Sequence, residues 1–201
     1  MFTPIPEAIE AFKRGEFLIV MDDESRENEG DLIIAAELTT TQAMAFLVRH
    51  SSGFICVPLE ESRADELNLP PMCINNEDKH STAYTVTVDA AAGTTGISAQ
   101  DRSLTVRLLG SSTSVATDFT RPGHICPLRA KDGLLKVRRG HTEAGVQLAK
   151  LAGLQPAACI SELVRDEDGL MMRLPDCESF AQKHGIKIIT IEQLVEYSES
   201  L

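Results

Sequence analysis

Ten residues, Asp22-Asp23-Glu24-Ser25-Arg26-Glu27-Asn28-Glu29-Gly30-Asp31, separate two apolar runs at positions 17–21 and 32–36. Both runs have the length and aliphatic content of buried strands, so the segment between them is expected to be a loop held by two core elements. Six of its residues carry carboxylates, and Arg26 stands among them. Because a cation reduces the repulsion between crowded carboxylates, the segment indicates a site for a hard divalent ion such as Mg²⁺ or Mn²⁺. The alternative is a solvated acidic turn.

The spacing of the acidic residues excludes a calcium-binding EF-hand loop. Such a loop needs glycine at its sixth position and a helix after it. The sixth residue is Glu27 when counting begins at Asp22 and Asn28 when it begins at Asp23, and a strand-type run follows.

The bulk composition is that of one globular domain. The chain has 201 residues, of which 43% are hydrophobic and 24% are charged. A net charge of −11 argues against nucleic acid and anionic membrane as partners, because both attract basic surfaces. Five cysteines without a C-x-x-C pair indicate free thiols in a reducing, cytoplasmic setting, with Cys56, Cys126 and Cys159 as core residues. No apolar run approaches membrane-spanning length.

Helix and strand patterns interleave along the chain. Strands are expected at 17–21, 32–36, 54–57, 84–89, 125–128, 134–137, 157–164 and 186–190, and helices at 5–14, 41–49, 59–67, 99–109, 142–153, 176–184 and 191–197. Residues 68–81 and 93–98 are expected to be loops, and 121–124, which contains Pro122-Gly123, a turn. This order favours an α/β or α+β fold of three layers.

A second motif, Arg138-Arg139-Gly140-His141-Thr142-Glu143, opens one of these helices. Free backbone N–H groups at a helix start attract anions, and glycine permits close approach. Arg138 can hold a phosphate with two hydrogen bonds, Thr142 can cap the helix or bind a phosphate oxygen, and His141 can ligate a metal or transfer a proton. The alternative is a capped surface helix with solvated arginines.

Two further residues are candidates for proton transfer. Glu162 lies inside an apolar run, where a carboxylate is costly unless it has a metal, a base partner or a catalytic purpose; an interior salt bridge is the alternative. His124 precedes another apolar run, where a lone histidine is usually structural. His50, His80 and His184 have no informative neighbours. Together the motifs indicate a metal-dependent sugar-phosphate enzyme that forms an enolate.

Four segments resemble, in the same order, motifs of the 3,4-dihydroxy-2-butanone-4-phosphate synthase family of riboflavin biosynthesis. They are residues 22–31, 94–102, 121–125 and 138–143. The match covers nearly the whole chain, so a single synthase domain at 1–201 is expected, without the GTP cyclohydrolase II half fused to it in many relatives. The resemblance implies an α+β fold with a mixed twisted sheet between helices, related to the YrdC-like nucleotide-binding proteins.

The resemblance also implies an activity. Members of this family are lyases that convert D-ribulose 5-phosphate into formate and L-3,4-dihydroxy-2-butanone 4-phosphate. They use Mg²⁺, as one or two ions, and Mn²⁺ is expected to substitute. They are homodimers whose sites lie near the subunit interface and use residues of both chains.

Carried over position by position, the resemblance assigns metal binding to Glu27 and His141. It assigns catalysis to His124, Glu162 and Asp31. It places the following residues at the substrate: Arg26, Glu27, Asp31, Thr95, Arg138, Arg139, Gly140, His141, Thr142 and Glu162. Relatives often have a small residue in place of Arg139, so its backbone N–H rather than its side chain is the expected contact.

Two other functions compete with this interpretation. A pentose-phosphate isomerase or epimerase would share the first proton abstraction, and release of formate distinguishes it. An anion- or nucleotide-binding module would share the fold, but the acidic loop and His141 favour catalysis.

Overall fold

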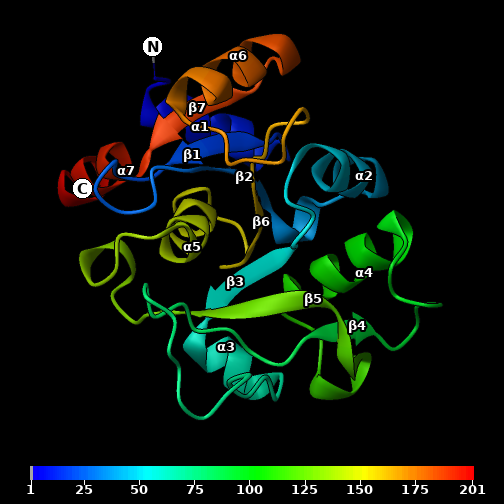
Figure 1. The fold of residues 1–201 in the computed structure, drawn as a ribbon. Helices are drawn as coiled ribbons and strands as arrows, with labels where there is room; N and C mark the ends of the chain where they lie inside the picture. The colour runs from blue at the N-terminus through cyan, green and yellow to red at the C-terminus, as the bar shows by residue number, and fades with distance from the viewer. Residues whose placement is uncertain (1) are drawn as a thin grey trace.

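A computed structural model describes residues 2–201, and over that range the chain forms one seven-stranded mixed sheet (Figure 1). The strand order is β4-β5-β3-β6-β2-β1-β7. Strands β1 and β7 pair in parallel, as do β3 and β5, whereas the other neighbouring pairs are antiparallel. The strands are β1 (Leu18–Met21), β2 (Gly30–Ala35), β3 (Cys56–Glu60), β4 (Val88–Ala90), β5 (Phe119–Ala130), β6 (Ala158–Glu162) and β7 (Lys187–Thr190). The expected α+β class is confirmed.

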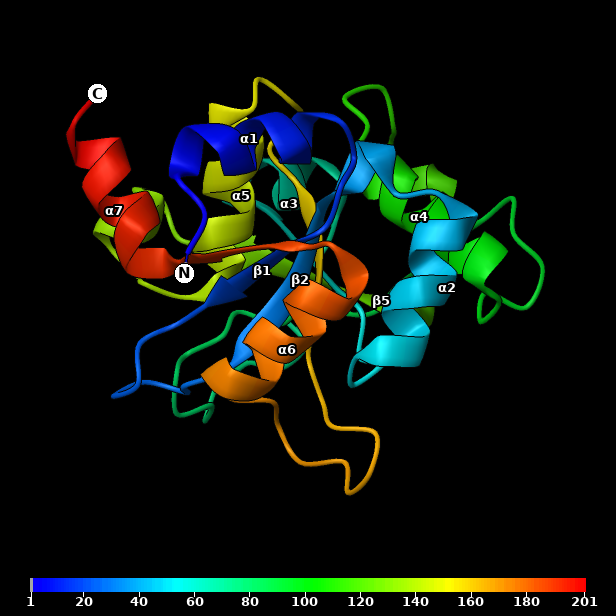
Figure 2. The ribbon, with the colours of Figure 1, turned by 90° about the horizontal axis from the view of Figure 1, so that it is seen from above.

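Helices cover both faces of the sheet and make the expected three layers (Figure 2). Leu18 and Val20 of β1 join the core beneath α1, α5 and α7, whereas Ile19 and Met21 join the core beneath α2, α4 and α6. Both faces of β1 are therefore buried, which explains its unbroken apolar sequence. The helices are α1 (Ile5–Lys13), α2 (Thr41–His50), α3 (Glu61–Glu66), α4 (Ala99–Leu109), α5 (His141–Leu151), α6 (Leu174–His184) and α7 (Ile191–Glu199).

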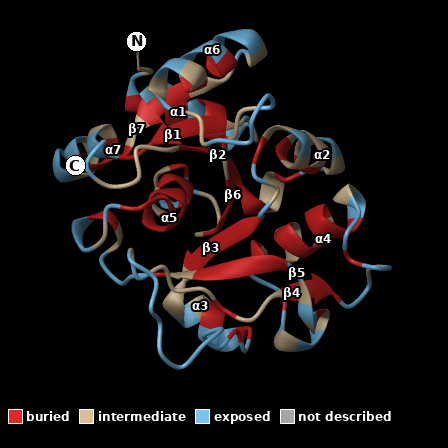
Figure 3. Ribbon diagram, in the orientation of Figure 1, coloured by how far each residue is buried: buried red, intermediate tan, exposed pale blue. Residues whose placement is uncertain are grey.

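Helix ends follow the local signals in the sequence. The hydroxyl of Thr40 accepts the N–H of Ala43 at the start of α2, and that of Ser98 accepts the N–H of Asp101 at the start of α4. Gly185 ends α6 with a φ of 67°. The strands are mostly buried, except for the first half of β5, and the connecting loops are mostly exposed (Figure 3). No helix within residues 2–201 has the length and apolar content needed to span a membrane.

The expected turn at residues 121–124 is wrong, because these residues lie inside β5. Val88 of β4 pairs with Ile125, but the next residue, Asp89, pairs with Thr120. The register shift leaves the four intervening residues as a bulge, which accommodates Pro122 and Gly123 in a strand. The bulge also sets the direction of His124.

Three other expected elements differ in the structure. The expected strand at 134–137 is wrong: Gly133 and Leu134 have positive φ, and a 3-10 helix, η3 (Leu134–Lys136), follows. The expected strand at 84–89 shortens to β4, preceded by isolated bridges at Tyr84 and Thr85. The helix expected from 59 begins at Glu61, because parallel pairing with β5 extends β3 to Glu60.

Candidate active site

The acidic loop occupies residues 22–29, between the end of β1 and the start of β2. Asp22 organises it. Its Oδ1 accepts the N–H of Glu29 at 2.8 Å, and its Oδ2 accepts the N–H of Glu27 at 3.1 Å and Nη1 of Arg26 at 2.9 Å. The Asp22 side chain is fully buried, so these bonds replace its hydration. Asp31, expected in the loop, belongs instead to β2.

Two arginines hold the loop closed. Arg26 also pairs with the carboxylate of Glu27, so its positive charge lies between two negative groups. Arg173, just before α6, donates to the carbonyl oxygens of Glu27 at 2.6 Å and Asn28 at 2.5 Å. Sequence reasoning missed Arg173, because it lies more than 140 residues away and in no recognisable motif.

His141 is the first residue of α5 and is buried. Its Nε2 donates to the carbonyl oxygen of Val20 at 3.0 Å, which leaves Nδ1 as the free acceptor. Nδ1 lies 3.7 Å from Oδ1 of Asp31 and 3.9 Å from Oε2 of Glu27. Burial lowers the pKa of His141 below its usual range. The imidazole is therefore neutral near pH 7, with its nitrogen directed at two carboxylates, as a metal ligand requires.

Asp31 and Glu162 face each other on neighbouring strands. They are register partners in the β2–β6 pair. Burial, followed by the charge of Glu162, raises the pKa of Asp31 well above its usual range, and Oδ1 of Asp31 has no hydrogen-bond partner. Glu162 is the last residue of β6 and half-buried rather than enclosed in mid-strand as expected. The hydroxyl of Ser52 donates to its Oε2 at 2.6 Å.

These residues fit a hard divalent cation. Asp22, Glu27 and His141 offer ligand atoms that all lie within 4.8 Å of one another. The oxygens of Asp22 already accept three hydrogen bonds, so Glu27 and His141 are the better ligands. The unpartnered oxygen of Asp31 lies on the same side of His141. Two protein ligands leave positions for water and substrate oxygens, which suits Mg²⁺.

Arg138 stands beside this cluster. Its guanidinium donates to Glu143 at 2.6 Å, to the hydroxyl of Thr82 at 3.0 Å and to the carbonyl of His80 at 3.1 Å. Three of its five N–H groups are thus used, and two remain for a ligand. A Cβ on Gly140 would lie 2.4 Å from Nη1 of Arg138 and 3.1 Å from Nη2 of Arg26, so glycine makes room for both guanidinium groups.

Thr142 is the second residue of α5 and does not cap it. The residue before the helix is Gly140, which offers no side chain to the free N–H groups. These donors therefore remain available to an anion, as the motif suggested.

A small cavity of about 60 Å³ lies among these groups. Its lining includes His141, Thr142, Arg138, Arg26, Glu27, Glu29, Asp31, Glu162, Cys56, Thr82, Tyr84, Leu128 and Ile160. Thr82 was not expected here. Neither was His80, whose Nε2 lies 3.7 Å from Oε1 of Glu27. Both come from or directly follow the polar 68–81 loop, whose sequence gives no sign that it folds over the site.

Four expected site residues do not line this cavity. Gly140 directly precedes α5, where its lack of a side chain makes room for Arg26 and Arg138. His124 lies in the β5 bulge, where it contacts Asp89, and Thr95 lies in an exposed loop next to Gly96, which approaches the same pair. The side chain of Arg139 is exposed and pairs with Glu192 at 2.6 Å. One chain thus forms two separate groups of candidate residues.

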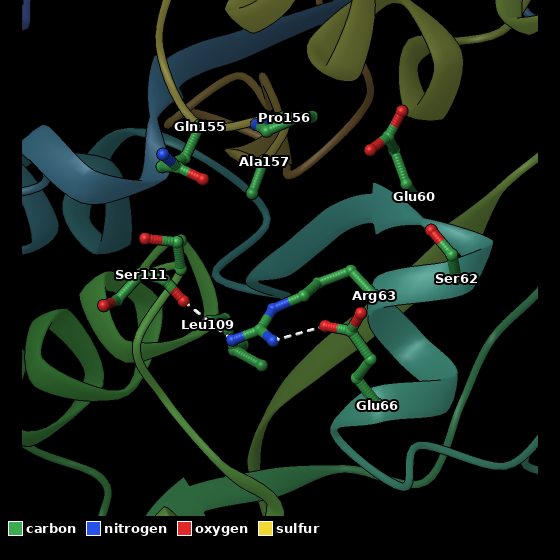
Figure 4. Close-up of a pocket in the computed structure, with 11 residues that line it drawn as sticks. Glu60, Ser62, Arg63, Glu66, Leu109, Ser111, Gln155, Pro156 and Ala157 are labelled. Atoms are coloured by element: carbon green, nitrogen blue, oxygen red, sulfur yellow. Dashed lines mark hydrogen bonds and ion pairs between the residues drawn. The ribbon is translucent and has the colours of Figure 1, made fainter.

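A larger cavity, of about 300 Å³, lies between α3, the end of α4 and the start of β6 (Figure 4). Its central cation, Arg63, donates to Glu66 at 2.6 Å and to the carbonyl oxygens of Ser111 and Ser114 at 2.8 Å. These bonds use Arg63 to join two elements. Among the described residues, Asp31 has a buried oxygen without a hydrogen-bond partner in the first cavity, and no residue that lines this second cavity has such an atom.

Comparison with known proteins places the chain among lyase-type enzymes. A family model described as 3,4-dihydroxy-2-butanone 4-phosphate synthase matches residues 6–197. The chain belongs to this family.

Individual relatives cover nearly the full chain. It is 70% identical over 198 residues to the 3,4-dihydroxy-2-butanone 4-phosphate synthase of Candida albicans, covering 98% of this chain and 97% of the relative. It is 60% identical over 205 residues to that of Saccharomyces cerevisiae, covering 98% and 99%. A solved structure of a 3,4-dihydroxy-2-butanone 4-phosphate synthase in complex with two magnesium ions matches with a TM-score of 0.95 and 50% identity, over 99% of this chain and 98% of that one.

Proposed function

We propose that this chain converts D-ribulose 5-phosphate into L-3,4-dihydroxy-2-butanone 4-phosphate and formate, a step of riboflavin biosynthesis, as a single cytoplasmic synthase domain over residues 1–201. The observation that carries the proposal is the convergence of Glu27, His141 and the unpartnered oxygen of Asp31 beside Arg138 at the open start of α5. Such a site places a cation position and a phosphate position around one small cavity.

Glu27 and His141 would hold Mg²⁺, as one or two ions, or Mn²⁺ in its place. The cation would stabilise negative charge on adjacent sugar oxygens. Arg26 now pairs with Glu27 and Asp22, so engagement of Glu27 by a cation would free part of its guanidinium for the substrate. Arg138, Thr142 and the backbone N–H groups after Gly140 would bind the phosphate.

Proton transfers would fall to Asp31, Glu162 and His124. Asp31 is buried, and its raised pKa makes its carboxylate a stronger base than an exposed one. Glu162 lies opposite it across the strand pair and is held by Ser52. His124 is outside the cavity of its own chain, so we place it in the site of a second copy, in a homodimer whose two sites use residues of both chains.

The proposal is tested by incubating the purified protein with ribulose 5-phosphate and measuring formate. Protein treated with EDTA should release none, and added Mg²⁺ or Mn²⁺ should restore release. Unphosphorylated ribulose is the control substrate. Full turnover in EDTA would refute the cation, and interconversion of pentose phosphates without formate would indicate an isomerase or epimerase instead.

A further inference from the structure

We propose that Asp89 is a positioning residue that fixes the tautomer and orientation of His124; the inference rests on the role of His124 in the proposed function. Asp89 lies in β4, and His124 lies in the bulge of β5 opposite it. The residues are 35 positions apart in the sequence, and the β4–β5 pair brings them together.

Asp89 contacts both the side chain and the main chain of His124. Its Oδ2 lies 2.7 Å from Nδ1 of the imidazole, and its Oδ1 accepts the backbone N–H of the same residue at 2.8 Å. Because a carboxylate only accepts hydrogen bonds, Nδ1 carries the proton and Nε2 is left as an acceptor. The side chain of His124 is 42% exposed and that of Asp89 only 12%, so the pair presents its histidine outward.

The neighbouring loop is shaped to fit this pair. Gly96 has a φ of +83°, and a Cβ there would lie 2.0 Å from Oδ2 of Asp89 and 2.8 Å from Nδ1 of His124. Asp101, in the first turn of α4, holds the loop by accepting the hydroxyl of Thr94 at 2.7 Å and the N–H of Gly96 at 3.2 Å. The segments 94–102 and 121–125 therefore build one unit around the imidazole.

This arrangement determines what His124 can do. With Nδ1–H bonded to Asp89, Nε2 can take a proton from a substrate, and the carboxylate stabilises the imidazolium that forms. An asparagine at position 89 would have nearly the same shape, but it carries no charge and can itself donate a bond to Nδ1. The imidazole would then be free to adopt the other tautomer, with Nε2 protonated and unable to accept.

The first test compares Asp89→Asn with the control variant Asp118→Asn. Asp118 lies beside the start of β5, and its carboxylate accepts the backbone N–H of Val115 at 2.8 Å. We expect Asp89→Asn to lower kcat for formate release by about 10²-fold, within the range of a general acid or base, with KM almost unchanged. Asp118→Asn should keep the wild-type kcat. In ¹⁵N NMR, the wild-type protein should show His124 protonated at Nδ1, and Asp89→Asn should lose that signature.

A second pair of variants covers the case in which Asp89→Asn does not fold. Gly96→Ala should push Asp89 and His124 apart and lower kcat. Gly169→Ala is the control, because Gly169 also has a positive φ, of +71°, but nothing lies within 4 Å of the added carbon. It therefore has a similar backbone cost without a clash against Asp89 or His124. Wild-type kcat in Asp89→Asn, equal effects of the two glycine variants, or an Nε2–H tautomer in the wild-type protein would overturn the inference. A wild-type protein that releases no formate would instead overturn the proposed function, and the NMR measurement would still decide the Asp89–His124 contact.

Discussion

The two candidate site histidines, His141 and His124, are held in opposite ways. His141 is buried, with Nε2 bonded to a backbone carbonyl and Nδ1 directed at carboxylates inside the chain. His124 is 42% exposed, with Nδ1 bonded to a carboxylate and Nε2 directed outward. The first arrangement suits a metal ligand whose partners belong to the same chain. The second suits proton transfer to a molecule that lies outside the chain.

His124 does not line the cavity of its own chain. It lies in the bulge of β5, four residues before Leu128, which does line the cavity. In the proposed dimer, a second copy supplies His124 and so brings the two regions together.

The largest expected effect comes from Glu162, which lines the cavity beside the candidate metal ligands Glu27 and His141. Glu162→Gln keeps the shape and can still accept from Ser52, but it loses the charge. We expect formate release to fall by about 10²–10⁴-fold, as for removal of a general acid or base. Thermal unfolding of the same sample should show that the fold persists. Glu60→Gln, at the end of β3 and paired with Lys150, is the matched control and should remain active. An active Glu162→Gln protein would show that Glu162 acts through its hydrogen bond with Ser52 and not through its charge.

A smaller effect is expected for Arg138. If Arg138 binds the phosphate as proposed, Arg138→Ala removes those charge-assisted bonds, and ribulose 5-phosphate should bind about 1.5–3 kcal/mol more weakly. Unphosphorylated ribulose should lose far less. Because Arg138 also bonds to Glu143, an equal loss for both sugars would show that the arginine acts only by supporting the site.

We expect the Asp31 carboxylate to lower the stability of the folded protein while supporting formate release. Its pKa is raised in the folded protein, so the folded state binds more protons than the unfolded one above about pH 3.9, the usual value for an unfolded aspartate. Stability is thus lost as pH rises from there through the folded pKa. In metal-free protein, Asp31→Asn should raise Tm at pH 7 by about 2–4 °C for each kcal/mol gained, with less gain toward pH 4. It should also impair formate release. A lower Tm at pH 7 would contradict this explanation.

The smallest effect is expected for Arg139. Its side chain forms an exposed ion pair with Glu192, with both partners more than half exposed. Arg139→Ala should therefore change the free energy of unfolding by less than about 1 kcal/mol, the upper range for exposed pairs. KM should change little, because the side chain pairs with Glu192 and does not line the small cavity. A large increase in KM would place the side chain at the substrate.

The region around Glu27 and His141 could be predicted from the sequence largely because its signals are local. The acidic loop and the start of α5 each lie within a short segment. The helix caps elsewhere in the chain, such as Thr40 and Ser98, are local signals as well. The second region depends on pairing across 35 residues, and no local pattern reports it. Pro122 and Gly123 indicated a turn, but the register shift between β4 and β5 made a bulge of the segment.

Contacts between segments that are distant in the sequence also explain the other differences between the predicted and the observed site. Strand β2 begins at Gly30, two residues before the apolar run that predicted it, because residues 30 and 31 pair with β1 and Asp31 also pairs with β6. His80 and Thr82 reach the site through contacts with Glu27 and Arg138 that are more than 50 residues away in the sequence. Ser52 was missed for the same reason.

The most direct test of whether the two regions meet across a dimer is a mixed dimer of His124→Ala and Glu27→Gln chains. The chains carry different affinity tags and are purified by both. Each variant alone should release almost no formate. In the mixed dimer, one of the two shared sites regains both intact residues, so about half of the wild-type activity per dimer should return. A mixed dimer of Glu27→Gln with Glu162→Gln, in which both sites keep one defect, should stay inactive. An inactive mixture of His124→Ala with Glu27→Gln would contradict the shared site.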